Sequence, residues 1–197
     1  MAVDTFLALV TFAFVTSVTP GPNNFMLLAS GANFGFARTV PHMFGIAAGF
    51  ASLLMGVGFG LGTLLQSWPA LHLLLKIAGG SYLIYLAWKI AGSRALADDE
   101  TVSRPVTFLQ AAAFQWVNPK AWMMALTAMV LFANPAEPGI SVLLVSAAFV
   151  VVNFPSVSIW AGFGTVMRRA LSSPQHLRWF NMTMGVLLLA TLVPMML

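Results

Sequence analysis

The chain of 197 residues has no cysteine and very few charged residues. Without cysteine there is no disulfide, no thiolate nucleophile and no thiolate metal site, which excludes redox relays of the Cys-x-x-Cys type. Charged residues make up 7% of the chain and hydrophobic residues 59%, whereas an ordinary soluble domain is about one quarter charged. This composition is typical of an integral membrane protein, with the lipid bilayer as its surroundings.

The few charges also lack the arrangement that nucleic-acid binding requires. The net charge is +4, but the basic residues lie between hydrophobic segments and form no continuous basic face. We therefore expect no nucleic-acid partner. The first basic residue is Arg38, so the N-terminus lacks the basic region of a signal peptide, and we expect its apolar segment to be retained.

Apolar runs of about 20 residues predict membrane-spanning helices. Six such runs are present, at Phe6 to Ser30, Val40 to Leu65, Leu71 to Ile90, Phe108 to Phe132, Ile140 to Met167 and Leu177 to Met196. We expect an all-α polytopic membrane protein, a single transmembrane domain over residues 1–197. It consists of two three-helix repeats, residues 1–92 and 107–197, joined by a cytoplasmic linker at 93–106. Because three is odd, the second repeat enters the membrane from the opposite side, so the repeats are inverted.

The basic residues predict the orientation of these spans. They lie in or beside the connections after the first, third and fifth spans: Arg38, Lys89, Arg94, Arg104, Arg168, Arg169 and Arg178. By the positive-inside rule these connections are cytoplasmic. The protein is thus expected to cross the membrane several times with both termini on the outer side.

Proline interrupts the first and fourth spans at corresponding places. Thr19-Pro20-Gly21-Pro22-Asn23-Asn24 lies in the first, and Asn118-Pro119-Lys120 in the fourth. A proline removes a backbone hydrogen bond and frees carbonyl groups that lipid cannot satisfy. Each break lies roughly 15 Å from an expected span end at 1.5 Å per residue, near the middle of the bilayer. Paired breaks of this kind indicate the binding site of a secondary transporter.

Each side of the first break predicts a different kind of ligand contact. After Pro22 the free N–H groups of a new helix form an anion site. Before Pro20, the carbonyls of Thr16, Ser17 and Val18 lose their donors, and we expect them to accept from a cation. Together these groups suit a zwitterion. The predicted substrate-binding residues are Thr19, Pro20, Gly21, Pro22, Asn23, Asn24, Gln115, Asn118, Pro119 and Lys120.

Lys120 is the one charged residue near the centre of an expected span. A buried ammonium is costly and indicates function, and the acidic residues all lie outside the spans or at their edges. One interpretation is that the substrate supplies the counter-charge as a carboxylate. The alternative is that Lys120 caps the carbonyls freed by the break and contacts no ligand.

Three weaker features of the sequence have more than one interpretation. Asn153, Pro155, Ser156 and Ser158 form a polar interruption in the fifth span, more typical of interhelical hydrogen bonding than of substrate contact. Gly45-x-x-x-Gly49 and Gly56-x-x-x-Gly60 form a small-residue stripe in the second span, for packing within the chain or in a homodimer. His42, His72 and His176 lie near different expected span ends, which does not favour a metal site.

These motifs resemble those of the LysE/RhtB family of bacterial amino-acid exporters. The resemblance rests on Thr19 to Asn23, Gly45 to Phe50 and Asn118 to Lys120, and it covers nearly the whole chain. The segments most similar to the cysteine/O-acetylserine exporter branch are Pro20 to Asn24, Gly80 to Lys89 and Phe114 to Asn118. Some relatives carry an acidic residue where this chain has Phe50, which argues against export of lysine or arginine.

The resemblance implies a secondary transporter of the bacterial inner membrane, without a cofactor. It would export small neutral amino acids or derivatives of the cysteine, O-acetylserine, threonine or homoserine type, driven by proton antiport. The alternative is an exporter of another small solute or of a metal ion within the same superfamily. A membrane enzyme is not expected, because the spans contain no convergent set of carboxylate, histidine and cysteine residues.

Overall fold

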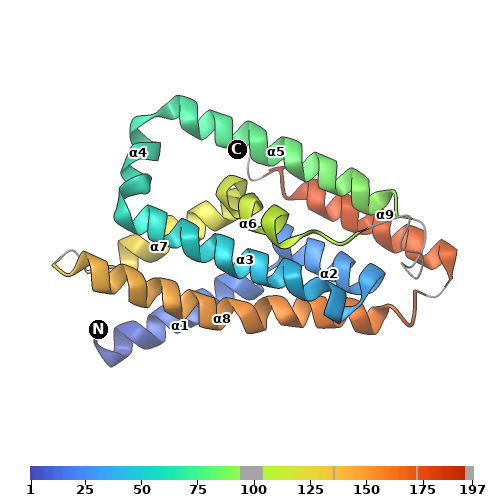
Figure 1. Cartoon of the computed structure of the whole chain (residues 1–197), viewed down its shortest axis with the longest axis horizontal. Coiled ribbons are helices and arrows are strands. Elements are labelled where there is room, and N and C mark those ends of the chain that lie inside the picture. Colours follow the sequence, from blue (N-terminus) through green and yellow to red (C-terminus); the bar gives the residue numbers. More distant parts are fainter. Residues whose placement is uncertain (94–103, 135, 172, 194–197) are drawn as a thin grey trace.

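Every regular element of the part of the chain that the structure describes is a helix. The computed structural model describes residues 1–93, 104–134, 136–171 and 173–193. The helices in chain order are α1 (Val3–Val18), α2 (Pro22–Phe34), α3 (Phe36–Gly56), the π-helical η1 (Val57–Leu61), α4 (Gly62–Ser67), α5 (Pro69–Ala91), α6 (Phe108–Val117), α7 (Pro119–Phe132), α8 (Pro138–Met167) and α9 (Pro174–Ala190). Figure 1 shows them as an elongated bundle.

Proline determines where several helices begin and why two expected spans are broken. The helices α2, α5, α7, α8 and α9 all start with proline, which suits the first helical position because no N–H is needed there. The residue before a proline is pushed out of the helical region. Thr19, Gly21 and Asn118 are accordingly extended. Both predicted breaks are present, and α1 and α2 meet at a bend of 57°.

Among the described residues, fewer helices are long and apolar enough to span a membrane than the six that the sequence predicted. Phe36–Leu65, Leu73–Ala91 and Pro138–Met167 are each long and apolar enough to cross a membrane, and α1 with α2 forms a bent fourth candidate. Helices α6, α7 and α9 have 10, 14 and 17 residues. The structure therefore supports a polytopic membrane protein, while the six-span arrangement remains a prediction. The last residues of the expected sixth span and most of the linker at 93–106 lie outside the described residues.

Two local expectations are wrong. The glycine stripe expected in the second span does not continue to Gly60, because Gly60 has a φ of 113° and kinks the chain within η1. Only glycine adopts this conformation readily. The polar interruption expected around Pro155 is absent, since α8 continues through it for 30 residues. The hydroxyls of Ser156 and Ser158 donate to Val152 and Phe154 of the same helix.

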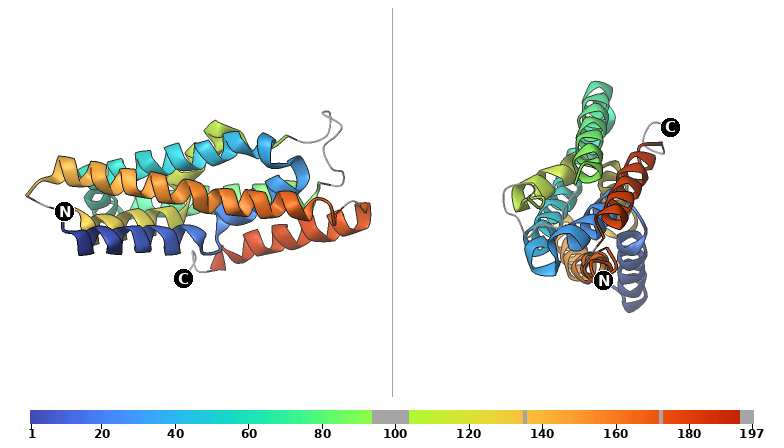
Figure 2. Two further views of the ribbon diagram at one scale, coloured as in Figure 1. Left: turned by 90° about the horizontal axis from the view of Figure 1, so that it is seen from below. Right: turned by 90° about the vertical axis from the view of Figure 1, so that its right-hand side faces the viewer.

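The two halves of the chain exchange their packing partners. Helices α1 and α2 from the first half pack along α8, whereas α6 and α7 from the second half pack along α3. Helix α5 pairs with α9 and stands at one side of the bundle (Figure 2). Each broken helix thus lies against the long helix of the opposite half, and the two breaks come to line one cavity.

Glycine allows the closest of these contacts. A side chain at Gly45 or Gly49 would collide with the carbonyl oxygens of Phe108 and Ala112 on α6. This stripe therefore serves packing within the chain. Gly31 of α2 and Gly164 of α8 form a second such contact, because a Cβ on either would meet the backbone of the other helix.

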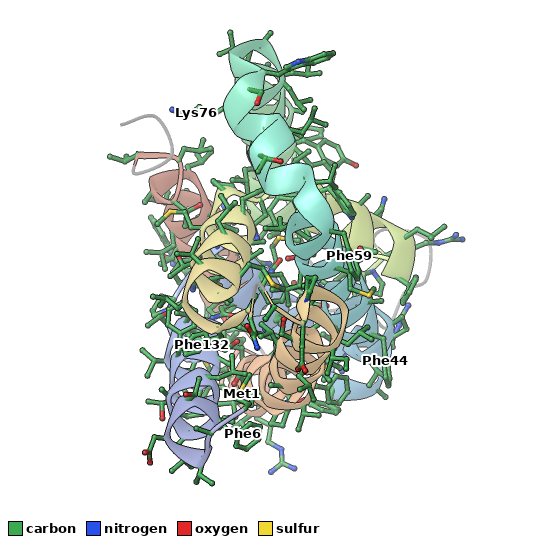
Figure 3. All side chains as sticks on the ribbon, turned by 90° about the vertical axis from the view of Figure 1, so that its left-hand side faces the viewer. Met1, Phe6, Phe44, Phe59, Lys76 and Phe132 are labelled. Carbon is green, nitrogen blue, oxygen red and sulfur yellow. The ribbon has the colours of Figure 1, made fainter. Side chains whose placement is uncertain are left out.

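The outer surface of the bundle is apolar and its basic residues gather at one end. Phe6, Phe44 and Phe59 are at least half exposed and point outward (Figure 3). Arg104 lines one surface pocket with Arg38 and another with Lys89. Arg38 is in the first turn of α3 and Lys89 in the last turn of α5, at the end of the bundle where α2 passes to α3, opposite the N-terminus (Figure 1).

Gly164→Ala tests the contact between α2 and α8. The added methyl group would collide with the carbonyl oxygen of Leu28, so we expect the thermal unfolding temperature in detergent to fall, with a loss of about 1–3 kcal/mol. The matched control is Gly162→Ala on the same helix, where nothing lies within 4 Å of the new methyl group. Equal unfolding temperatures for the two variants would contradict this packing.

Candidate functional site

Both proline breaks line one cavity in the interior of the bundle. The cavity has about 370 Å³ of space between atoms, part of it open to the surroundings. From the first break it is lined by Gly21, Pro22, Asn23 and Asn24, and from the second by Gln115, Asn118 and Lys120. The breaks therefore face each other, as the sequence predicted.

Side chains satisfy the carbonyl groups that the first break exposes. Asn24 donates through Nδ2 to the carbonyls of Ser17, at 3.0 Å, and Thr19, at 2.7 Å. The indole of Trp160 donates to Val18 at 3.2 Å, and the Thr19 hydroxyl donates to Thr16 at 3.0 Å. The expectation that the carbonyls of residues 16–18 accept from a cation is thus wrong, because neutral donors already occupy them.

The ammonium group of Lys120 binds the next two carbonyl groups along the chain, those of Thr19 and Pro20. Lys120 Nζ donates to the carbonyl oxygen of Thr19 at 2.7 Å and to that of Pro20 at 3.4 Å. Its third contact is the hydroxyl of Thr19, at 3.2 Å. Lys120 therefore caps the broken helix, which was the alternative interpretation of this residue. It also lines the cavity, so capping and ligand contact are compatible.

Gly21 leaves the space through which the lysine reaches these carbonyls. A Cβ at this position would lie 2.8 Å from Lys120 Cδ and 3.0 Å from Nζ. The backbone of Gly21 is extended, at φ −176°, so the need for glycine here comes from the close approach. The glycine between the two prolines thus belongs to the lysine site on another helix.

A reciprocal pair of amides joins the two broken helices. Asn23 Nδ2 donates to Gln115 Oε1 at 2.8 Å, and Gln115 Nε2 donates back to Asn23 Oδ1 at 3.1 Å. Gln115 is fully buried and donates in addition to the carbonyl of Ala111. This pair ties the start of α2 to the end of α6 across half the sequence.

The second break has its own caps. The Asn118 side chain accepts from the backbone N–H of Lys120 at 3.1 Å and so caps the start of α7. The indole of Trp122 donates to the carbonyl of Trp116 at 2.7 Å, and Trp116 donates to the Ser52 hydroxyl. The two tryptophans that flank this break therefore stabilise it.

Seven of the ten predicted residues line the cavity, and three do not. Thr19 and Pro20 lie outside it and offer their carbonyls to Lys120. Pro119 acts through the backbone, since it begins α7 and holds Asn118 in an extended conformation. The sequence thus predicted which residues meet around the cavity, but it did not separate lining residues from supporting ones, and their role in substrate binding stays a prediction.

Sequence reasoning missed Asn153 as a lining residue. It faces the cavity from α8 and is 6% exposed. Its Nδ2 donates to the Ser17 hydroxyl at 3.1 Å, while its Oδ1 is buried without a hydrogen-bonding partner among the described residues. The signal was a lone asparagine in an apolar span, which interhelical bonding also explained. The remaining lining residues are Thr16, Ser17, Ile46, Phe50, Ala121, Met124 and Val157.

The electrostatics of the cavity are one-sided. Lys120 is its only charged lining residue among those described, and the described acidic residues, Asp4 and Glu137, lie near the ends of α1 and α8. Helix α2 adds the positive end of its dipole, because Gly21 provides no side-chain cap for the first N–H groups. The site therefore attracts a carboxylate and offers no acid to a metal ion.

Comparison with known proteins places this site in a family. The model of the LysE type translocator matches residues 14–194 of the chain. The chain belongs to the LysE family. Both breaks, the amide pair and Lys120 lie within the matched residues, so the cavity belongs to a translocator.

Curated relatives of this LysE family member match over nearly their whole length. A cysteine/O-acetylserine efflux protein of Escherichia coli O139:H28 (strain E24377A / ETEC) is 31% identical over 183 residues, which is 91% of each chain. Proteins of the same name from Escherichia coli (strain K12) and Shigella flexneri serotype 5b (strain 8401) are 31% identical over 182 residues, 90% of each chain. No solved structure matches.

The amide pair predicts non-additive stability effects. Gln115→Leu leaves the Asn23 amide without its partner, and an unsatisfied buried polar group costs about 1–3 kcal/mol. We expect each single leucine variant, at position 23 or 115, to lower the thermal unfolding temperature in detergent. The double variant Asn23→Leu/Gln115→Leu should lose clearly less than the sum of the two. Strictly additive losses would show that the amides do not interact.

Proposed function

We propose that this LysE family member exports small neutral amino acids or their derivatives from the cytoplasm, of the cysteine, O-acetylserine, threonine or homoserine type. The observation that carries the proposal is Lys120, a cation placed where two broken helices meet, in a cavity whose described lining has no acidic residue. The names of the relatives, cysteine/O-acetylserine efflux proteins, support the same substrate class.

The carboxylate of the substrate binds between Lys120 and the start of α2. When a carboxylate approaches, the ammonium group exchanges the carbonyls of Thr19 and Pro20 for a partner of opposite charge. The N–H groups of Asn23 and Asn24 lie in the uncapped first turn of α2 and point at the same place. Charge-assisted hydrogen bonds of this kind are about twice as strong as neutral ones.

The ammonium group of the substrate binds at the opposite side of the cavity. Asn153 lines the cavity, and its buried Oδ1 has no partner among the described residues, so in this proposal it turns toward the substrate and accepts an N–H donor. The substrate side chain then lies against Ile46, Phe50, Met124 and Val157. These apolar residues suit a small uncharged side chain and leave a cationic one unpaired. A metal ion does not fit this set of groups, since it lacks thiolate, carboxylate and imidazole ligands.

The protein works, in this proposal, as two inverted repeats in the inner membrane. Residues 1–92 and 107–197 each form three spans, joined by a cytoplasmic linker at 93–106, and both termini are periplasmic. The packing of the helices supports the repeat. Helices α1 and α2 pack against α8 of the other half, and α6 and α7 pack in the same way against α3. The shared location of Arg38, Lys89 and Arg104 at one end supports the orientation. Export is coupled to proton entry.

Transport by everted membrane vesicles tests the function. Vesicles with the wild-type protein should take up labelled cysteine, O-acetylserine, threonine or homoserine, and an acidic vesicle interior should increase the uptake. Lys120→Met should lower the uptake at least tenfold, to a small residual rate, because the carboxylate loses its counter-charge. Lys76→Met, which alters a lysine of α5 outside the cavity, should transport like the wild type.

A second comparison separates loss of binding from loss of folding. The wild type should prefer cysteine to cysteamine, which lacks the carboxylate, whereas residual transport by Lys120→Met should show no such preference. Wild-type vesicles that take up none of the four amino acids would reject the function. Unchanged discrimination in Lys120→Met would reject the role of the lysine.

Labelling of single cysteines tests the orientation, and the chain is suited to it because it contains no cysteine of its own. We expect Glu137→Cys, at the start of α8, to react with a membrane-impermeant maleimide added to intact cells. Gln175→Cys, at the start of α9, should react only in everted vesicles. Both positions are exposed. The reverse labelling pattern would invert the proposed topology.

A further inference from the structure

One titratable residue in the interior has no place in the substrate site. His42 of α3 is fully buried, and neither Nδ1 nor Nε2 has a hydrogen-bonding partner among the described residues. The sequence predicted a location near the end of an expected span, and the structure adds that the side chain is enclosed by the bundle. Buried polar groups are almost always hydrogen-bonded, so an imidazole with two free ring nitrogens requires an explanation.

His42 lies on the face of α3 that borders the cavity. Residues four apart share one face of a helix, and Ile46 and Phe50, the next two in this series, both line the cavity. His42 is therefore one turn from the cavity, about 6 Å along the helix axis at 1.5 Å per residue, on the side toward Arg38.

Polar groups continue from His42 toward the basic end of the bundle. The hydroxyls of Ser30 and Thr39 are buried and hydrogen-bonded to each other at 2.9 Å. Thr39 lies one turn before His42 on α3, and its hydroxyl also contacts the carbonyl of Gly35. The imidazole thus occupies a position between the cavity and the end that carries the arginines.

No acidic residue faces His42 from the helices packed around it. Helices α2, α6 and α8 contain no ionisable side chain, and α7 contains only Lys120, which is bound to the first break. On α3 itself the other ionisable residue is Arg38, and Arg104 precedes α6. A proton on His42 is therefore not neutralised by the described residues, and its charge repels an ammonium group in the cavity.

We propose that His42 is the proton-binding residue that couples amino-acid export to proton entry. The inference rests on the proposed function. The neutral imidazole accepts one proton from the outer side after the substrate has left, and the imidazolium releases it to the cytoplasm before the next substrate binds. Because the exported zwitterion has no net charge, each cycle moves one positive charge inward.

The experiment uses purified protein in proteoliposomes and compares two partial reactions. Exchange of labelled for unlabelled O-acetylserine, at equal pH on both sides, requires no net proton movement. Accumulation driven by a pH gradient requires coupling, and one proton per substrate supports about tenfold accumulation for a gradient of about one pH unit.

We expect His42→Gln to retain exchange and to lose the accumulation driven by the pH gradient. The matched control is His176→Gln, which changes an exposed histidine of α9 and should behave like the wild type in both reactions. Gradient-driven accumulation by His42→Gln, or loss of its exchange in folded protein, would overturn the assignment.

A binding measurement gives an independent answer. In weakly buffered detergent solution, substrate should displace protons from the wild-type protein and none from His42→Gln or His42→Asn. Equal proton release by all three proteins would overturn the assignment. A wild type that neither exchanges nor accumulates amino acids would reject the proposed function itself, and one that exchanges without responding to the gradient would reject antiport and with it the role of His42.

Discussion

A backbone group in the hydrocarbon of a membrane must find its partner within the protein, and this constraint explains the arrangement of the site. Two proline breaks free carbonyl groups from the hydrogen bonds of their helices. Asn24, Trp160 and Lys120 satisfy those of the first break, and Trp122 satisfies one of the second. The cavity, its cation and its asymmetry all follow from these caps.

The sequence was sufficient for the all-helical fold, both breaks and their convergence, because proline acts locally on its own and the preceding residue. It did not show that neutral side chains occupy the carbonyls of residues 16–18, since Trp160 donates from more than 140 positions away. The kink at Gly60 was equally hidden. A glycine four residues after another is typical of a packing stripe, and the sequence alone does not distinguish the stripe from the kink.

The sequence was also insufficient for two buried polar residues, His42 of α3 and Asn153 of α8. In the sequence Asn153 belonged to a polar interruption and His42 lay near a span end, whereas their burial and the missing partners of Asn153 Oδ1 and of the imidazole depend on the packing of α8 and α3. Tertiary contacts of that kind have no local signal. The proposed sites for the ammonium group and for the proton therefore came from the structure, whereas Lys120 came from the sequence.

The hydrogen bonds from Lys120 to the carbonyls of Thr19 and Pro20 have a consequence for substrate binding by the proposed exporter. Because Lys120 already donates to these two carbonyls, an arriving amino acid must displace those bonds, and it gains only the difference in free energy between the two sets of contacts. Weak affinity follows from this competition. Under the proposed function, an exporter with such a competing internal contact works best when its amino acid is abundant in the cytoplasm.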